Sequence, residues 1–258
     1  MINGGLRTRG ITKKSTDEKP LITVVTVVYN GEATLEQTIQ SVVNQSYVNV
    51  EYIIVDGAST DSTLDIIKKY EDKIDYWQSE PDKGIYDAMN KGIGLASGEW
   101  INFMNAGDFF FENEVISKIV GYCEHNTKLY GDYYNLTEKK MISQANLQNL
   151  FLRNINHQTI FYCSKYLKNT SFNLKYKILA DWELNLRLFA KNKFDYFPIT
   201  IANYEGAGIS TTKTDMSFYK DYNSIIFYNY GFLSFIIFIS QRLLRKIKFL
   251  KGNLFLQK

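Results

Sequence analysis

The sequence contains few of the residues that break or cross-link a chain. Its 258 residues include three prolines and two cysteines, Cys123 and Cys163. Proline and glycine are too sparse for a disordered or low-complexity chain. Two cysteines outside a CxxC pair exclude a disulfide framework, so we expect both thiols to be reduced and buried. The 45% share of hydrophobic residues is enough to form one large core.

Two further absences concern location and charge. No apolar segment follows Met1, so the sequence predicts no secretory signal and a cytoplasmic location. No acidic residue follows Asp221, whereas six basic residues do, and the net charge of +3 therefore comes from the C-terminal tail. These six are Arg242, Arg245, Lys246, Lys248, Lys251 and Lys258. We expect no nucleic-acid partner.

Apolar strands and amphipathic helices alternate along the first half of the chain. This alternation predicts an α/β fold with a mostly parallel, doubly wound sheet and helices on both faces. Strands are predicted over residues 21–28, 50–56, 74–79 and 99–104, and helices over 34–45, 59–72, 85–96 and 112–124.

Polar residues and glycines follow every predicted strand. Because the carboxyl ends of parallel strands meet at one edge of a sheet, these residues are expected to line a ligand-binding rim. The alternative is that each is only a turn residue, but four such groups at this spacing favour a site. They are Tyr29-Asn30-Gly31, Asp56-Gly57, residues 80–84 and residues 105–108.

Three carboxylates on this rim, Asp56, Asp82 and Asp108, repel one another unless a cation or hydrogen-bonding groups lie between them. The phosphate-loop pattern GxxxxGK[ST] and the dinucleotide pattern GxGxxG are both absent after the first strand, where the turn reads YNGEAT. Two interpretations remain: sugar hydroxyls between the carboxylates, or a divalent ion on Asp108 that bridges a diphosphate.

Several segments, taken in order, resemble glycosyltransferase family 2, the nucleotide-sugar transferases with the GT-A fold. The resemblance covers roughly residues 21–205, and the subgroup it looks most like builds bacterial O-antigen, capsule or exopolysaccharide. It implies an inverting transfer from a nucleotide-diphosphate sugar. The segments are TVVTVVYNGEATLEQTIQSVVNQSY, IIVDGASTDST, SEPDKGIYDAMNKGIGLASGEWINFMNAGD, HQTIFY and ADWELNLRL.

On the donor side, the resemblance implies roles for the residues of the rim. Thr26 and Tyr29 would line the base pocket, and Asp56 would contact the base or the ribose. Asp82 and Lys83 would lie near the ribose and the phosphates.

The metal-site segment matches the family only in part. Asp108 would match the last aspartate of the D-x-D motif and hold Mg²⁺ or Mn²⁺, and Asn105 would contact the nucleotide sugar. Ala106 stands where the family often has the first aspartate, so a second metal ligand has to come from elsewhere. His157 is the candidate, and the alternative is a histidine with purely structural partners.

Asp181 would match the catalytic base of the family, and Glu183 is the alternative base. A carboxylate at the start of a helix is favoured in its ionised form by the helix dipole, although a simple N-cap aspartate gives the same pattern. Two other functions compete with this one. They are a sugar-phosphate nucleotidyltransferase and a non-catalytic nucleotide-binding protein of the same fold.

The division of the chain follows from these observations. Residues 1–20 are predicted to be an arm without regular structure, residues 21–215 the GT-A domain, and residues 216–258 a helical tail. In this tail apolar and basic residues fall on different sides of a helix, as in helices that lie in a membrane interface. We therefore expect a peripheral protein on the inner face of the cytoplasmic membrane with a lipid-linked or oligosaccharide acceptor. Packing on the domain or a homo-oligomer contact is the alternative.

Overall fold

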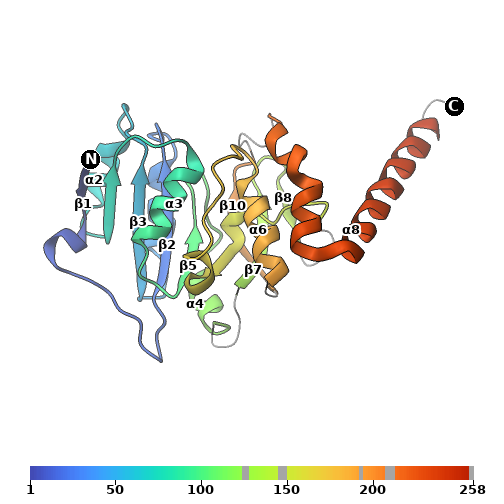
Figure 1. The fold of residues 1–258 in the computed structure, drawn as a ribbon. Coiled ribbons are helices and arrows are strands. Elements are labelled where there is room, and N and C mark those ends of the chain that lie inside the picture. The colour runs from blue at the N-terminus through green and yellow to red at the C-terminus, as the bar shows by residue number, and fades with distance from the viewer. Residues whose placement is uncertain (124–127, 145–149, 192–193, 207–212, 256–258) are drawn as a thin grey trace.

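One mixed sheet runs through the body of the protein, and helices cover both of its faces (Figure 1). The computed structural model describes residues 1–123, 128–144, 150–191, 194–206 and 213–255, apart from the side chains of Lys128 and of residues 244–255. Within these residues the sheet has ten strands in the order β1-β4-β3-β2-β5-β9-β7-β10-β6, with β8 paired to β7. The predicted α/β class is confirmed.

Four parallel strands form the half of the sheet nearest the N-terminus. They lie side by side in the order β4-β3-β2-β5, and each is built from an apolar run of the sequence. Each predicted strand is therefore confirmed, with small differences at the ends. The bounds are β2 Ile22–Val28, β3 Val50–Asp56, β4 Tyr76–Ser79 and β5 Trp100–Phe103.

The side chains of β2 alternate between two cores, one on each face of the sheet. Val25 and Val27 pack in the core that includes α3 and α6, whereas Val24 and Val28 pack in the core that includes α1, α2 and α4. A strand buried on both faces therefore needs the continuous apolar run that the sequence has. The helices are α1 Leu35–Val43, α2 Thr63–Lys69, α3 Ile85–Leu95, α4 Val115–Val120 and α6 Ala180–Lys191.

The second half of the sheet is mixed. Strand β9 runs antiparallel to both β5 and β7, and β10 runs parallel to β7. Short strands β6 and β8 pair antiparallel with β10 and β7. The bounds are β6 Phe109–Phe110, β7 Lys128–Asn135, β8 Lys140–Ile142, β9 Ile160–Cys163 and β10 Asp195–Tyr204, and the short helix α5, Ser164–Leu167, follows β9.

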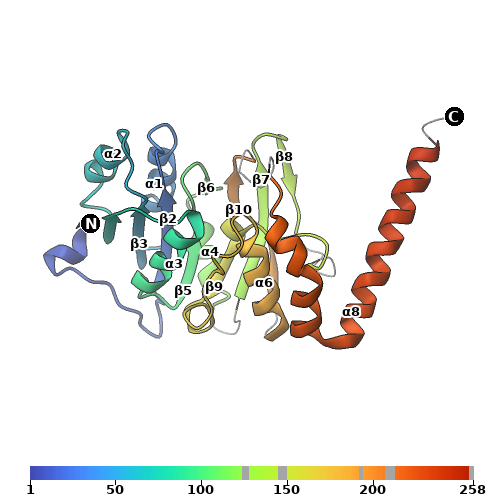
Figure 2. The same ribbon diagram turned by 45° about the horizontal axis from the view of Figure 1, so that its top comes forward.

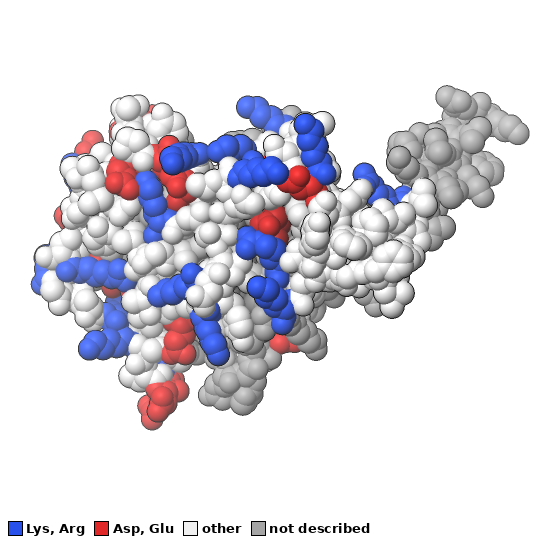
Figure 3. Space-filling view, in the orientation of Figure 1, with Lys and Arg blue, Asp and Glu red and all other residues white. Residues whose placement is uncertain are grey.

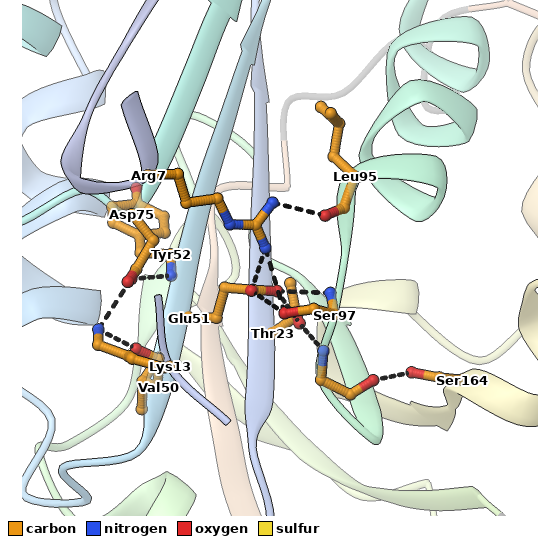
Figure 4. Close-up of polar contacts among 11 residues, drawn as sticks. Arg7, Lys13, Thr23, Val50, Glu51, Tyr52, Asp75, Leu95, Ser97 and Ser164 are labelled. Carbon is orange, nitrogen blue, oxygen red and sulfur yellow. Dashed lines mark hydrogen bonds and ion pairs between the residues drawn. The ribbon is translucent and has the colours of Figure 1, made fainter. Parts of the chain in front are cut away.

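The prediction of an arm without regular structure is wrong for the first residues of the chain. Strand β1, Ile2–Gly4, pairs antiparallel with β4, and the 3₁₀ helix η1, Leu6–Arg9, follows it. Arg7 forms an ion pair with the buried carboxylate of Glu51 (Figure 4). Glu51 also accepts hydrogen bonds from Thr23 Oγ1 at 2.6 Å and from the Ser97 amide at 2.8 Å. These contacts attach the N-terminal segment to the sheet.

The C-terminal helix α8, Met216–Phe255, is bent rather than straight. Gly231 has non-helical angles, with φ 78° and ψ 177°, and divides the helix into two arms. The first arm packs beside α6. The second arm begins against the body, where Phe238 is buried, and projects away from it further along (Figures 1 and 2). The predicted helical tail is confirmed, and its first arm is part of the core because Phe218, Tyr222 and Ile226 are buried.

The two cysteines are free thiols, as expected, but each is half-buried rather than buried.

Removal of Arg7 tests how firmly the N-terminal segment is held. Burial alone would raise the pKa of Glu51, but hydrogen bonds from Ser97 and Thr23 and the Arg7 charge hold it below the usual range. Arg7→Met should lower the free energy of unfolding at neutral pH by about 1–3 kcal/mol in urea titrations. The deficit should shrink below about pH 4, where the stabilisation from ionised Glu51 is lost in wild type as well.

Arg9→Met is the matched control for this measurement. Arg9 pairs with Asp72 at 2.7 Å, but that pair is exposed to solvent. Its loss should change the free energy of unfolding by no more than about 0.5 kcal/mol. Equal effects of the two substitutions would contradict a special role for the Arg7–Glu51 pair.

Candidate active site

A cavity of 410 Å³ opens where the carboxyl end of β5 meets the second half of the sheet. Its walls come from segments far apart in the sequence: the start of α3, the loop after β5, the 3₁₀ helix η3 (His157–Thr159), the start of α6 and the end of β10. Several polar side chains line it. They are Asn105, Asp108, Asn154, Asn156, His157, Gln158, Asp181 and Glu205.

Asp181 is the most heavily hydrogen-bonded group of the cavity. The amide nitrogen of Trp182 lies 2.8 Å from Oδ1, and the Tyr86 hydroxyl lies 3.0 Å from the same oxygen. On Oδ2, Asn154 Nδ2 lies at 2.8 Å and His157 Nδ1 at 3.3 Å. Four groups that can donate hydrogen bonds therefore surround one carboxylate. Burial and the neighbouring Asp181 charge raise the pKa of Tyr86 well above its ordinary value, so this hydroxyl stays protonated and can donate.

The alternative base, Glu183, does not line this cavity. Its two carboxylate oxygens accept hydrogen bonds from Arg187, at 2.6 Å from Nε and 2.9 Å from Nη2. The pair belongs to a separate shallow hollow on the other side of α6, between Ser171 and Leu174. The geometry therefore favours Asp181 over Glu183.

Asp108 lines the same cavity from the loop between β5 and β6. Gln158 Nε2 donates to its Oδ2 at 2.6 Å, and the Glu205 amide donates to Oδ1 at 3.1 Å. Burial raises the pKa of Asp108 to about 6, although these two hydrogen bonds act in the opposite direction. Gly107, with φ 100°, gives the loop the turn that brings this carboxyl group to the cavity. At neutral pH it is still mostly ionised.

His157 contacts Asn105 and Asp181. Its Nε2 is 2.8 Å from Asn105 Nδ2, and its Nδ1 faces Asp181. Since both ring nitrogens have partners, we place His157 beside Asp181 instead of in a metal site. Within the described parts of the chain, no group of three or more His, Cys, Asp or Glu side chains could hold a metal ion.

The residues predicted for the nucleotide lie along the carboxyl ends of β2, β3 and β4. The Tyr29 side chain is 65% exposed and borders Gly57, and Asp82 Oδ2 also approaches Gly57 closely. Asp82 Oδ1 accepts a hydrogen bond from the Gly84 amide at 2.7 Å, and Lys83 is exposed. These residues form an open rim beside the cavity, so their predicted roles are sterically feasible.

Two predicted contacts with the nucleotide do not fit the structure as it stands. Thr26 is fully buried, and its Oγ1 donates to the Met104 carbonyl at 2.7 Å. It belongs to the core of the sheet and not to the base pocket. Asp56 is also fully buried, and its oxygens accept hydrogen bonds from Ser59 and Ser79. In this arrangement Asp56 shapes the loop after β3 and does not face solvent.

The comparison with family models decides which family this arrangement belongs to. The model of glycosyl transferase family 2 matches residues 23–211, most of the chain. The chain belongs to glycosyl transferase family 2. A "PGL/p-HBAD biosynthesis glycosyltransferase" of Mycobacterium bovis (strain BCG / Pasteur 1173P2) is similar, with 33% identity over 213 residues, 78% of this chain and 83% of the relative. The protein is thus a glycosyltransferase, and the match gives no support to a nucleotidyltransferase.

Solved structures confirm the GT-A type of fold for this family 2 transferase. S. aureus TarS 1–349 in complex with UDP-GlcNAc has a TM-score of 0.68 at 18% identity, covering 81% of this chain and 65% of that one. In the longer TarS structure the match spans only 39% of the neighbour. A mannosyltransferase from Pyrobaculum calidifontis, in complex with GDP-Man and Mn²⁺, has a TM-score of 0.60 at 15% identity over 75% and 59% of the chains.

Sequence reasoning missed three residues of the transferase cavity. Tyr86 and Asn154 contact Asp181, and Gln158 contacts Asp108. Gln158 directly follows His157 in the segment HQTIFY, so its position next to a predicted site residue could have identified it. Tyr86 and Asn154 gave no such signal, because each reaches Asp181 only through the tertiary fold.

Proposed function

We propose that this glycosyltransferase moves a sugar from a nucleotide-diphosphate sugar to an acceptor hydroxyl with inversion at the anomeric carbon. The observation that carries the proposal is the arrangement of two carboxylates on one cavity: Asp181, surrounded by donors, and Asp108, on the side of the nucleotide rim. Asp181 takes the proton of the acceptor hydroxyl while its oxygen attacks the anomeric carbon. The bond to the diphosphate breaks on the opposite face, and the nucleoside diphosphate leaves.

Asp181 can release one of its four hydrogen bonds to do this. A carboxylate has about four lone-pair positions, so the observed donors fill them all. The Tyr86 hydroxyl, however, also lies 2.6 Å from the Ile178 carbonyl and has only one proton to donate. When Tyr86 donates to Ile178, one position on Asp181 Oδ1 becomes free for the acceptor hydroxyl.

Substitution of the base is the first test. Asp181→Asn should lower the turnover by about 10²- to 10⁴-fold, the usual worth of a general base, and should leave nucleotide binding unchanged. The donor is first chosen by thermal shifts against UDP-, GDP- and dTDP-sugars, and release of the nucleoside diphosphate is then measured.

Glu183→Gln is the matched control, because Glu183 is on the same helix but outside the cavity. It should affect stability through Arg187 more than turnover. Unchanged turnover in Asp181→Asn would remove Asp181 from the role of base.

The residues around Asp108 fit a divalent cation. Asn105 Oδ1 is buried and has no hydrogen-bond partner among the described atoms, which makes it a second oxygen available on this wall. Mg²⁺ and Mn²⁺ commonly use one or two protein oxygens together with phosphate oxygens and water, so two protein oxygens suffice. The cation would neutralise charge on the departing diphosphate, and Asp108 and Asn105 would hold it.

Metal dependence is the second test. Activity should require Mg²⁺ or Mn²⁺ and disappear in EDTA. In Asp108→Ala, added Mn²⁺ should no longer increase the affinity for the nucleoside diphosphate in calorimetric titrations. Full activity in chelator would contradict this and would direct attention to Lys83 as the cation that binds the diphosphate.

Attachment to a membrane surface is the third part of the proposal, and it rests on the bent helix α8. Among the described residues, Met216–Leu243 is one helix that could cross a membrane by length and composition. The break at Gly231 divides it into two shorter arms, and the surface over the bend is uncharged (Figure 3). Large apolar side chains are exposed there: Phe227 41%, Tyr228 82%, Phe232 68%, Leu233 73%, Ile236 47% and Ile237 47%.

These exposed residues suit the interface of a bilayer. No charged residue occurs between Asp221 and Arg242, and basic residues dominate beyond that point. Apolar side chains next to cationic ones favour a position in the plane of an anionic leaflet. The spacing of the tail predicts an apolar face formed by Leu243, Leu244, Ile247 and Leu250. Leu243 is 56% exposed, and the other three side chains lie outside the part that the structure describes. A lipid-linked acceptor confined to that plane would reach the cavity from the side of α8.

Liposome sedimentation tests this part. The double variant Phe232→Ser with Leu233→Ser should bind anionic vesicles at least about 10-fold more weakly than wild type at low salt, because each lost apolar side chain contributes about 1.5 kcal/mol or more when buried. Val48→Ser with Met141→Ser removes two exposed apolar residues elsewhere and should bind normally. Truncation at Asp221 is unsuitable, because it removes buried residues of α8. If the wild-type protein does not bind such vesicles but forms dimers, the exposed residues at the bend form a subunit contact instead.

A further inference from the structure

His157 lies between two side chains that together determine where its ring proton sits. Its Nδ1 faces a carboxylate oxygen of Asp181 at 3.3 Å, and a carboxylate only accepts hydrogen bonds. Nδ1 therefore carries a hydrogen. Its Nε2 lies 2.8 Å from Asn105 Nδ2, an amide nitrogen that only donates. Nε2 is therefore the acceptor, and the donating hydrogen of the ring is on Nδ1.

We propose that His157 is a positioning residue for the catalytic base, and that Asn105 sets its tautomer. This inference rests on the proposed role of Asp181 as base. The Nδ1–H group, together with Asn154 Nδ2, fixes Oδ2 of Asp181 from one side. Oδ1, whose Tyr86 partner can turn to Ile178, is left to receive the proton of the acceptor. In this arrangement Oδ2 of Asp181 fixes the position of the carboxylate, and Oδ1 receives the proton.

A consequence follows for the coupling between the two sides of the cavity. Asn105 belongs to the same loop as Asp108, and its amide nitrogen contacts His157. If a contact with the nucleotide sugar holds the Asn105 amide in this orientation, it also fixes the tautomer of His157. The position of the base is thus linked, through two side chains, to the loop beside the diphosphate.

The tautomer can be observed directly by nitrogen NMR of the full chain labelled with ¹⁵N-histidine. The sequence has two histidines, so His125→Gln leaves a single ring to observe. At about pH 8, above the ordinary histidine pKa of about 6.5, we expect a protonated Nδ1 and a bare Nε2. Asn105→Ala should remove this preference. A ring with its proton on Nε2, or one that averages both tautomers in wild type, would overturn the proposal.

Two isosteric variants separate the contacts of the ring. In His157→Asn the side-chain amide occupies the place of Nδ1 and keeps a donor toward Asp181. In His157→Gln the amide reaches the place of Nε2 and keeps only the contact with Asn105. We expect His157→Gln to lower kcat about 10- to 100-fold, the range for a hydrogen bond to a charged group, with KM for the nucleotide sugar unchanged. His157→Asn should retain most of kcat.

Equal turnover in the two variants would contradict a positioning role. Asp181→Asn, measured in the same assay, separates this failure from failure of the proposed function. If Asp181→Asn loses turnover and His157→Gln does not, only the inference about His157 is wrong. If Asp181→Asn turns over normally, the base assignment is wrong and the inference falls with it.

Discussion

Every buried carboxylate of this protein requires hydrogen-bond donors, and this requirement determines how distant segments meet. Asp181 draws together α3, η3 and the loop that carries Asn154, and Asp108 draws together η3 and the end of β10. Glu51 does the same for the N-terminal segment and the loop before β5. An isolated carboxylate would cost several kcal/mol in such surroundings. The hydrogen bonds that stabilise the buried carboxylates of the cavity therefore also fix its shape.

The parallel half of the sheet could be predicted from the sequence because its signals are local. An apolar run such as residues 22–28, a polar turn and an amphipathic helix follow one another within some 30 residues. The mixed half has no such signal. Strand β10 pairs with β7, some 65 residues earlier, and both strands carry many polar and tyrosine residues instead of an apolar run. The N-terminal strand β1 was missed for a similar reason, since three residues become a strand only beside β4.

Some features of the site could likewise be predicted from the sequence, and others could not. Asp108 and Asp181 could be located from the resemblance to a family, and the structure brings both to one cavity. Motif position says nothing about burial, however, and so it did not reveal that Thr26 faces the core and donates to Met104. It also did not reveal that His157 would turn toward Asp181, because the ring has two nitrogens and only the fold decides which neighbours they find. The residues that take part were therefore easier to predict than the directions in which their side chains point.

The glycine that bends α8 also gives the protein a lever. At 1.5 Å per residue, the arm beyond Gly231 is about 36 Å long, comparable to the width of a small domain. The near turns of this arm are not free to turn about Gly231, because Phe238 is buried against Phe151 and Tyr222. The first arm is in turn fixed to α6 by the stacked rings of Trp182 and Phe218. A force on the far end of the arm would therefore be transmitted to α6, the helix that carries Asp181.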